Sequence, residues 1–382
     1  MAIPTLTMIP SGYKAGKLYS VLPTNGDGDF TTTRSTTATR LNKSGLIETV
    51  LSNVPRLDYS YGSCPSLLIE LPKTNNIRYS ENTTASSDWT DPLNEWSSTL
   101  NTQISPSGEL SADTMSLSAS RSASLIRVQN MNLVAGTYAV SFWIKDIGGN
   151  MTGGTVDLGD VGGGDTTPSL STVGSDWIRV KRIITLTSTQ TRTDIQINFS
   201  GTSGQVSIWG LQIELGTTET SYIPTNGSTV TRARDIVING GDLNSLDVVE
   251  GTLFLDLFNF DNGVQSIISI SDGTETNKIQ LLFEPLLSRV RTFSTGGVLY
   301  HSNLDFNQRN KIAITFKNNE YKTFVNGVLE DTDTSATVPT GMDRLNFASR
   351  SGGFLPFEGQ VYDTRVYDAA LSNEELIQLT TI

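Results

Sequence analysis

The sequence has very few residues of the kinds that carry catalysis or disulfides. It has one cysteine, Cys64, and one histidine, His301, among 382 residues. A single cysteine excludes an intrachain disulfide framework, and no G-x-S-x-G elbow accompanies the histidine, as many serine hydrolases require. Cys/His metal spacings, phosphate-binding loops and dinucleotide fingerprints are missing too. We therefore expect no catalytic residues, no cofactor and no metal centre of these types.

Basic residues and long apolar runs are also scarce. Lys and Arg number 27 against 39 Asp and Glu, giving a formal net charge of -12, and no dense Lys/Arg cluster occurs. Because nucleic-acid binding needs clustered cationic side chains, we expect no nucleic-acid partner. No apolar stretch approaches the roughly 20 residues that span a bilayer. The start, MAIPTLTMIPSGYKAGK, lacks the pattern of a secretory signal. We expect folding in a cytoplasm and no membrane insertion.

What the sequence does contain favours β-structure. Its extended runs are dominated by Val, Ile, Thr and aromatic residues, which suit half-buried strands. In TYAVSFWIK (137–145), Tyr138, Val140 and Phe142 share one face with Ile144, and Trp143 lies on the other. The stretch 148–165 is so rich in glycine that it predicts a flexible loop. The one helix predicted with clear signals begins after Ser372, whose capping box closes at Glu375.

The pattern changes along the chain predict an all-β fold: two consecutive jelly-roll β-sandwiches preceded by an extended N-terminal arm. The predicted parts are an arm over residues 1–75, a first jelly roll over 76–224, a linker over 225–235 and a second jelly roll over 236–382. The arm has few long apolar alternations and is not expected to fold alone, so it needs a partner surface or copies of itself. The tetrapeptide PTNG at 224–227 is interpreted as a turn between the two sandwiches.

The C-terminal stretch carries the most specific motifs. NKIAITF (310–316), the segment YKTFVNGV (321–328) and FEGQVYDTRVYDAALSNEELIQL (357–379) follow one another there. Asn326-Gly327 predicts a type I′ hairpin. Together these motifs resemble the concanavalin A-like lectin/glucanase superfamily, in its laminin-G-like form. The resemblance implies a jelly roll over about 236–382. It also makes a structural calcium ion at the rim of the sheet possible. The candidate ligands are Asp256, Asp261 and Asp272, and each of them taken alone is not expected to bind calcium.

Two further resemblances concern the rest of the chain. The strands around WIRV (177–180) and the ending IWGLQIE (208–214) resemble a carbohydrate-binding-module-like jelly roll. That ending, with TSYIPT (220–225) and the runs ATRLNKSGLIE (38–48) and PRLDY (55–59), resembles bacteriophage virion proteins of the tail-fibre, head-fibre or appendage kind. This resemblance implies a virion protein assembled in the host cytoplasm, anchored to other virion proteins through its arm. It also implies a homotrimer.

Sugar binding needs aromatic faces for pyranose rings and polar groups for hydroxyls. The candidate glycan-binding residues are Trp143, Trp177, Arg179, Asn303, Asn346 and Arg350. For the two tryptophans, the sequence favours a simpler interpretation, in which both rings only cover the second face of the sandwich. The last three residues are expected on the polar rim of the second sandwich.

The sequence thus predicts a non-enzymatic virion structural protein that binds host surface polysaccharide. The alternative is a purely architectural capsid or tail decoration protein that binds only protein neighbours. A capsule depolymerase is disfavoured, because the Glu-x-Asp-x-x-Glu strand of related glucanases is missing and residues 255–258 offer a single acid.

Overall fold

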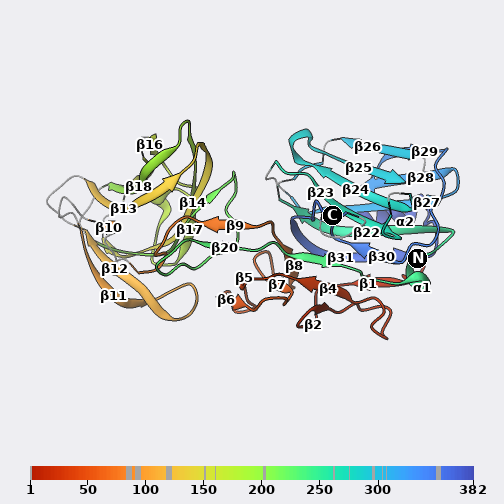
Figure 1. Ribbon diagram of the computed structural model, residues 1–382, viewed down its shortest axis with the longest axis horizontal. Coiled ribbons are helices and arrows are strands. Elements are labelled where there is room, and N and C mark those ends of the chain that lie inside the picture. The colour runs from red at the N-terminus through yellow and green to blue at the C-terminus, as the bar shows by residue number, and fades with distance from the viewer. Residues whose placement is uncertain are drawn as a thin grey trace. The chain divides into compact units, whose positions relative to one another are not determined.

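The computed structural model describes residues 2–82, 88–90, 96–117, 123–149, 152–159, 161–200, 204–260, 263–274, 276–294, 297–302, 304–306, 308–349 and 354–382. The chain divides into two compact units. Unit 1 comprises Met1–Gly45, Thr49–Pro72 and Ala233–Ile382, and unit 2 comprises Leu46–Glu48 and Lys73–Arg232. Each unit is built from antiparallel sheets (Figure 1), which confirms the all-β fold class.

Unit 1 is a sandwich of two large sheets. The first has the order β29 (Val328–Asp333), β28 (Glu320–Val325), β27 (Asn310–Lys317), β22 (Glu250–Asn259), β31 (Gly359–Tyr367), β8 (Ser66–Ile69) and β7 (Arg56–Asp58), and β1 (Leu6–Met8) also pairs with β31. The second has the order β26 (Gly297–Ser302), β25 (Arg289–Ser294), β24 (Lys278–Glu284), β23 (Ser266–Ser271) and β30 (Arg344–Asn346). Alternate residues of both sheets form one buried core, because the side-chain period of a strand is two.

A smaller sheet and two short helices complete unit 1. The sheet has the order β2 (Tyr13–Lys14), β3 (Lys17–Leu18), β4 (Phe30–Thr33) and β21 (Ile236–Ile238). The helices are α1 (Leu243–Leu246) and α2 (Asn373–Thr380), and η2 (Pro285–Leu287) is a 3-10 turn. Helix α2 begins with the predicted capping box between Ser372 and Glu375. The predicted hairpin also forms, with positive φ at Asn326 and Gly327 between β28 and β29.

The N-terminal segment is the main departure from the predicted architecture. Instead of forming an extended arm, most of residues 1–75 are built into the same unit as the C-terminal sandwich. Leu6 and Met8 of β1, and Leu67 and Ile69 of β8, are fully buried in the core of unit 1. The segment has too few apolar residues for a core of its own, and it gains one by adding strands to β31.

Buried charges tie three segments of unit 1 together. Arg34 follows β4, Arg56 begins β7, and both guanidinium groups donate to the carboxylate of Asp235, which precedes β21. Arg56 also donates to Glu70 at 2.6 Å, and these four side chains are at most 2% exposed. We call Arg34, Arg56, Glu70 and Asp235 the ion cluster. Its charges balance, as buried charges must if they are not to cost several kcal/mol each.

Unit 2 is a second sandwich, made of two five-stranded sheets. One has the order β10 (Trp89–Thr90), β13 (Ala123–Leu133), β18 (Gln190–Ser200), β15 (Gly153–Leu158) and β16 (Val161–Gly164). The other, which we call the site sheet, has the order β11 (Trp96–Ile104), β12 (Leu110–Leu117), β19 (Gly204–Leu215), β14 (Gly136–Gly149) and β17 (Ile178–Leu186). Tyr138, Val140, Phe142 and Ile144 lie in the core of this unit, as the alternation predicts.

Two predictions for unit 2 are corrected. The glycine-rich stretch 148–165 contains β15 and β16 rather than a loop, because Val156 and Leu158 anchor it in the core. A side chain at Gly154 would meet the Asn198 carbonyl at 2.2 Å, so glycine is what permits this close pairing. The predicted linker also forms structure: β20 (Val230–Arg232) pairs with β9 (Lys73–Asn75) inside unit 2.

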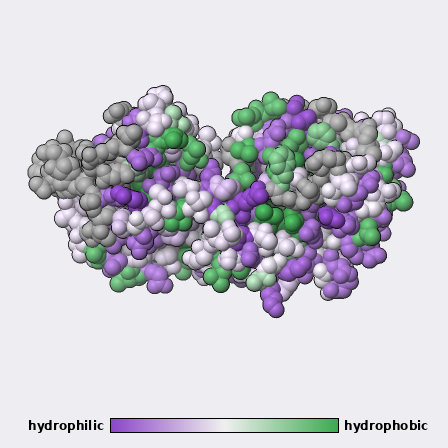
Figure 2. All heavy atoms as spheres, viewed as in Figure 1, coloured by the Kyte–Doolittle hydropathy of each residue, from purple (hydrophilic) through white to green (hydrophobic). Residues whose placement is uncertain are grey.

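The remaining elements are β5 (Ala38–Leu41), β6 (Ile47–Val50) and the 3-10 turn η1 (Leu170–Thr172). In the part of the chain that the structure describes, no helix combines the length and apolar character needed to cross a membrane. On the face shown in Figure 2, hydrophilic and hydrophobic surface residues are interspersed.

Candidate functional site

Two of the predicted residues, Trp143 and Arg179, come together on the outer face of the site sheet. They lie opposite each other on β14 and β17. The Arg179 guanidinium carbon is 4.4 Å from the centre of the Trp143 ring, and Nη2 donates to the Ser141 hydroxyl at 3.0 Å. A cation over an indole face is attracted by the ring's quadrupole. The pair is therefore fixed within the sheet face.

Trp143 also belongs to a cluster of three aromatic rings. Its ring centre is 5.5 Å from that of Trp209 on β19 and 5.7 Å from that of Tyr222, and the last two are 4.6 Å apart. Gly210 makes this packing possible, since its φ is +67° and a Cβ there would lie 2.8 Å from the Trp143 ring. Sequence reasoning missed Trp209 and Tyr222 as partners of Trp143; the glycine directly after Trp209 is the signal that was available.

The hydroxyl of Tyr222 connects this aromatic cluster to a carboxylate. It lies 2.6 Å from the Ser80 hydroxyl and donates to Glu81 Oε1 at 2.7 Å. Burial raises the pKa of Glu81 above its ordinary value, although the hydrogen bond from Tyr222 opposes the shift. Burial, and then the charge of Glu81, raise the pKa of Tyr222 well above its ordinary value. Tyr222 therefore stays neutral and holds the Glu81 carboxylate in place.

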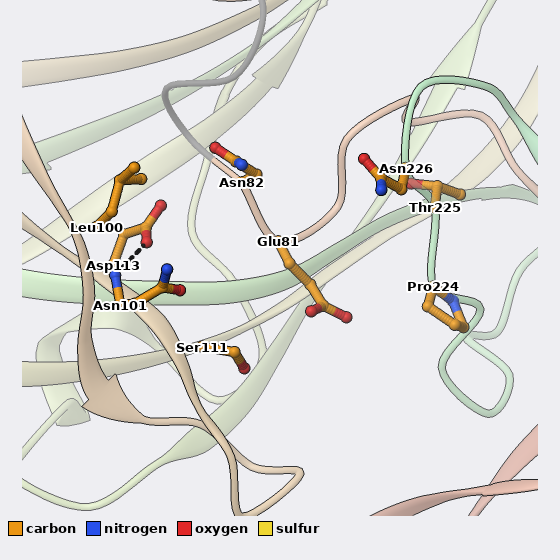
Figure 3. Close-up of a pocket in the computed structure, with 9 residues that line it drawn as sticks. All are labelled: Glu81, Asn82, Leu100, Asn101, Ser111, Asp113, Pro224, Thr225 and Asn226. Atoms are coloured by element: carbon orange, nitrogen blue, oxygen red, sulfur yellow. Dashed lines mark hydrogen bonds between the residues drawn. The ribbon is translucent and has the colours of Figure 1, made fainter.

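Glu81 stands in the wall of a pocket of about 340 Å³. The other lining residues come from β11, β12 and the segments 81–82 and 224–226: Asn82, Leu100, Asn101, Ser111, Asp113, Pro224, Thr225 and Asn226. Figure 3 shows Glu81 between Asn101, Ser111 and Asp113 on one side and Pro224, Thr225 and Asn226 on the other. We call this the polar pocket.

The strand irregularity in β11 shapes one wall of the polar pocket. The register between β11 and β12 shifts between Thr99 and Gln103, and Asn101 takes a positive φ of 49° in this stretch. The backbone N–H of Asn101 donates to Asp113 Oδ1 at 2.9 Å, the dashed line of Figure 3. A bulge redirects the side chains of a strand, and here it brings exposed Asn101 to the pocket.

The opposite wall consists of Pro224, Thr225 and Asn226 from the PTNG tetrapeptide at 224–227. The N–H of Thr225 donates to the Ser80 hydroxyl at 2.9 Å, and a β-bridge joins Tyr79 to Asn226. The side-chain hydroxyl of Thr225 has no hydrogen-bond partner among the described residues, although the residue is only 7% exposed. Three residues of the tetrapeptide, Pro224, Thr225 and Asn226, thus contribute to the pocket wall, and the tetrapeptide is not a turn between domains.

None of the predicted glycan-binding residues that the structure describes lines the polar pocket. Trp143 and Arg179 lie in and against the aromatic cluster, where Trp143 contacts Tyr222. Trp177 is half-buried, its indole N–H donates to the Ile104 carbonyl at 2.8 Å, and Lys145 Nζ lies 5.0 Å from its ring centre. It does not line the polar pocket. Asn346 is fully buried, and its side-chain oxygen accepts the backbone N–H of Asn239. It stands on β30, the last strand of its sheet, but the backbone of residues 237–240 pairs beside this strand, so it is not on an exposed rim. Asn303 and Arg350 lie outside the described residues.

The calcium candidates do not come together as a cation site. Asp256 accepts two hydrogen bonds from Arg309, and Asp272 accepts from Thr274 and Asn277. Asp261 lies outside the described residues, and so does the side chain of His301, whose backbone is in β26. Across the described ranges, no group of three or more acidic, histidine or cysteine side chains is arranged to hold a metal ion.

Comparison with known proteins supports the assignment of one domain. Residues 259–377, about a third of the chain, match the family model of the concanavalin A-like lectin/glucanases superfamily. Most of unit 1 is therefore similar to this lectin-type family, as the C-terminal motifs predict. No curated protein matches the chain significantly.

Several solved structures share part of the architecture. The CBM40 module of a Ruminococcus gnavus IT-sialidase, bound to α2,3-sialyllactose, is 22% identical over 37% of this chain and 91% of its own, with a TM-score of 0.32. Domain 4 of a Geobacillus stearothermophilus arabinanase, in complex with arabinotriose, is 11% identical over 43% of this chain and 82% of its own, with a TM-score of 0.30. Likenesses at this level add no argument about function.

Proposed function

We propose that this chain is a non-enzymatic structural protein of a bacteriophage particle, a head or tail fibre or appendage, that binds host surface glycans through the polar pocket of unit 2. The particle assignment is supported by the resemblance of residues 38–48, 55–59 and 208–225 to virion proteins. Glycan binding by the chain is supported by the lectin-type domain, which lies in unit 1, and binding through the polar pocket of unit 2 is supported by the composition of that pocket.

That composition is the observation on which the proposal rests. Sugar hydroxyls need donors and acceptors at fixed positions, and pockets for small ligands usually start at about 300 Å³. The polar pocket has this size and offers three amides, two carboxylates and two hydroxyls, with Leu100 and Pro224 as apolar contacts. Tyr222 fixes Glu81, and the backbone of Asn101 fixes Asp113, so the groups are oriented before a ligand arrives.

Attachment to a particle makes weak binding sufficient. A pocket of this size contacts one or two sugar rings, which favours modest affinity for a single site. Homotrimers, and several trimers per particle, raise the effective affinity by about 10²–10⁴ without new contacts. The proposed trimer is thus part of the function and not only of the assembly.

The direct test is saturation-transfer NMR and a glycan array with the purified protein. Asn226→Ala removes one exposed amide from the pocket wall, and we expect a loss of about tenfold in affinity. Asn132→Ala is the matched control, because Asn132 is exposed on β13 of the other sheet. If the wild-type protein shows no saturable binding at any valency, the architectural alternative, binding only protein neighbours, replaces this proposal.

A hydrolase is the second candidate, because two carboxylates, Glu81 and Asp113, line the same pocket and burial raises the pKa of Glu81. Retaining and inverting glycosidases both use a pair of acids of this kind. Release of reducing ends from host polysaccharide, abolished by Glu81→Gln and Asp113→Asn separately, would replace the non-enzymatic proposal with this one.

A further inference from the structure

The charges around the polar pocket are of one sign. Its nine lining residues include Glu81 and Asp113 and contain no Lys, Arg or His. Among the described residues near it in the chain or in the aromatic cluster, the cations are already engaged: Arg78 forms an ion pair with Asp88, and Arg179 stacks on Trp143 and donates to Ser141. The chain as a whole carries a net charge of -12. A ligand in the pocket therefore meets a negative potential.

The two carboxylates differ in how they are placed. Asp113 is 1% exposed, and its Oδ1 accepts the backbone N–H of Asn101. Its side chain is therefore buried within the pocket wall. Glu81 is partly exposed and stands between the two walls in Figure 3, with Oε1 held by Tyr222. Glu81 is therefore the carboxylate that faces a bound ligand.

We propose that the polar pocket selects sugars that carry a free amino group, accepts neutral sugars more weakly and rejects carboxylated ones, with Glu81 as the residue that sets this order. This inference rests on the proposed glycan-binding function and names its ligand class. An ammonium group donates three hydrogen bonds to carboxylate and amide oxygens, which the pocket supplies. A sugar carboxylate would be placed against Glu81 and Asp113 without a cation to compensate it.

The test uses three methyl glycosides that share one ring and differ in charge: the 2-amino sugar, its N-acetyl derivative and the uronic acid, in both the gluco and the galacto series. Affinities are measured by NMR titration at pH 7 with the full-length protein. We expect the amino sugar to bind about tenfold more tightly than its N-acetyl derivative, since a hydrogen bond to a charged group contributes about 1.5 kcal/mol. The uronic acid is expected to bind most weakly.

The variant Glu81→Gln keeps the shape of the side chain and an acceptor for Tyr222. We expect the affinities of this variant for the amino and N-acetyl sugars to lie within about twofold of each other, because the charged hydrogen bond is lost. Glu330→Gln is the matched control, because it removes the same charge from an exposed position on β29 of unit 1. It should leave the tenfold preference unchanged.

A second measurement needs no variant. Raising the salt concentration should reduce the preference for the amino sugar while the affinity for the N-acetyl sugar stays constant, because only the former binds through opposite charges. The inference is overturned if the uronic acid binds as well as the neutral sugar, if the preference is insensitive to salt, or if a folded Glu81→Gln variant keeps it in full. If none of the sugars binds in either series, the proposed function itself fails.

Discussion

The two units use buried charge in opposite ways. In unit 1 the ion cluster pairs two arginines with two carboxylates and leaves all four side chains almost inaccessible. In unit 2 Glu81 accepts a hydrogen bond from a neutral donor, Tyr222, and burial raises its pKa. A matched cluster joins segments of the chain and has no unpaired charge for a ligand. The partly buried Glu81 carboxylate, in contrast, has no cation beside it among the described residues, and a ligand that brings a cation would favour its charged form. This difference is consistent with a structural role for the ion cluster and with the binding role proposed for Glu81.

Breaking the ion cluster should have the largest effect. Arg56→Met leaves Glu70 without this cation and Asp235 with one arginine instead of two, so we expect unit 1 to lose about 3–5 kcal/mol of unfolding free energy. Hydrogen–deuterium exchange of peptides covering β7, β8 and β31 measures this loss. All five tryptophans lie in unit 2, so their fluorescence reports that unit separately and should show an unchanged denaturation midpoint.

The control for this prediction is Lys317→Met, which removes an ion pair whose side chains are both more than a third exposed. Exposed pairs contribute at most about 1 kcal/mol, so exchange in unit 1 should barely change. Equal effects of the two substitutions would mean that the ion cluster is not what holds these segments together.

The second prediction concerns the N-terminal segment and sharpens the boundary between the units. Leu6→Ala opens a cavity in the core of unit 1, where Leu6 is fully buried. We expect it to lower the unfolding free energy of unit 1 by about 2–5 kcal/mol. Urea denaturation followed by far-ultraviolet circular dichroism measures it. Leu51→Ala, at a residue that is 67% exposed in the same segment, is the control. An unchanged unit 1 would restore the view of residues 1–75 as a separate arm.

The third and smallest effect is a pH dependence of unit 2. Because burial raises the pKa of Glu81 in the folded state, the folded protein retains this proton to a higher pH than the unfolded chain does. The contribution of Glu81 to stability is therefore greatest below its unfolded pKa and declines as the pH rises through the folded pKa. Tyr222 and Asp113 are the other titratable groups that face Glu81 among the described residues, and Tyr222 stays protonated throughout.

Tryptophan fluorescence across a urea series at pH 4.5, 5.5, 6.5 and 7.5 measures this decline, and Glu81→Gln should reduce it. Burial also raises the pKa of Glu214 in the same unit, so part of the decline should persist in the variant. A steeper decline in Glu81→Gln than in the wild-type protein would contradict the assigned direction of the Glu81 shift.

Local patterns predicted the parts of the fold that depend on neighbouring residues. The alternation in residues 137–145, the Asn326-Gly327 hairpin and the Ser372 capping box all form as predicted, because each is determined within a few positions. Predictions that depended on distant segments were less accurate. The N-terminal segment has too few apolar residues for a core of its own, but it shares the core of the C-terminal sandwich. The glycine-rich stretch 148–165 pairs with β18, a strand that lies well beyond it in the sequence.

The candidate site shows the same division. The alternation placed Trp143 and Arg179 on the outer face of adjacent strands, where they do pair, but neither of them lines the polar pocket. Sequence reasoning missed Glu81, Asp113 and Thr225. These side chains come together only after three separate segments fold around β19. The sequence around any one of them does not indicate the other two. A pocket assembled from two strands and two further segments that are distant in sequence has no local sequence pattern.

The pairing of β9 with β20 has a consequence for how such chains change over time. These strands are the first and last elements of the long segment of unit 2, and they run side by side, with Thr74 opposite Thr231. A module whose first and last strands lie side by side can be exchanged through recombination for another module with the same distance between its ends. The sandwich of unit 1 then needs no change at the two points of connection. Under the proposed function, such an exchange replaces the glycan site of unit 2 and leaves the sandwich of unit 1 unchanged.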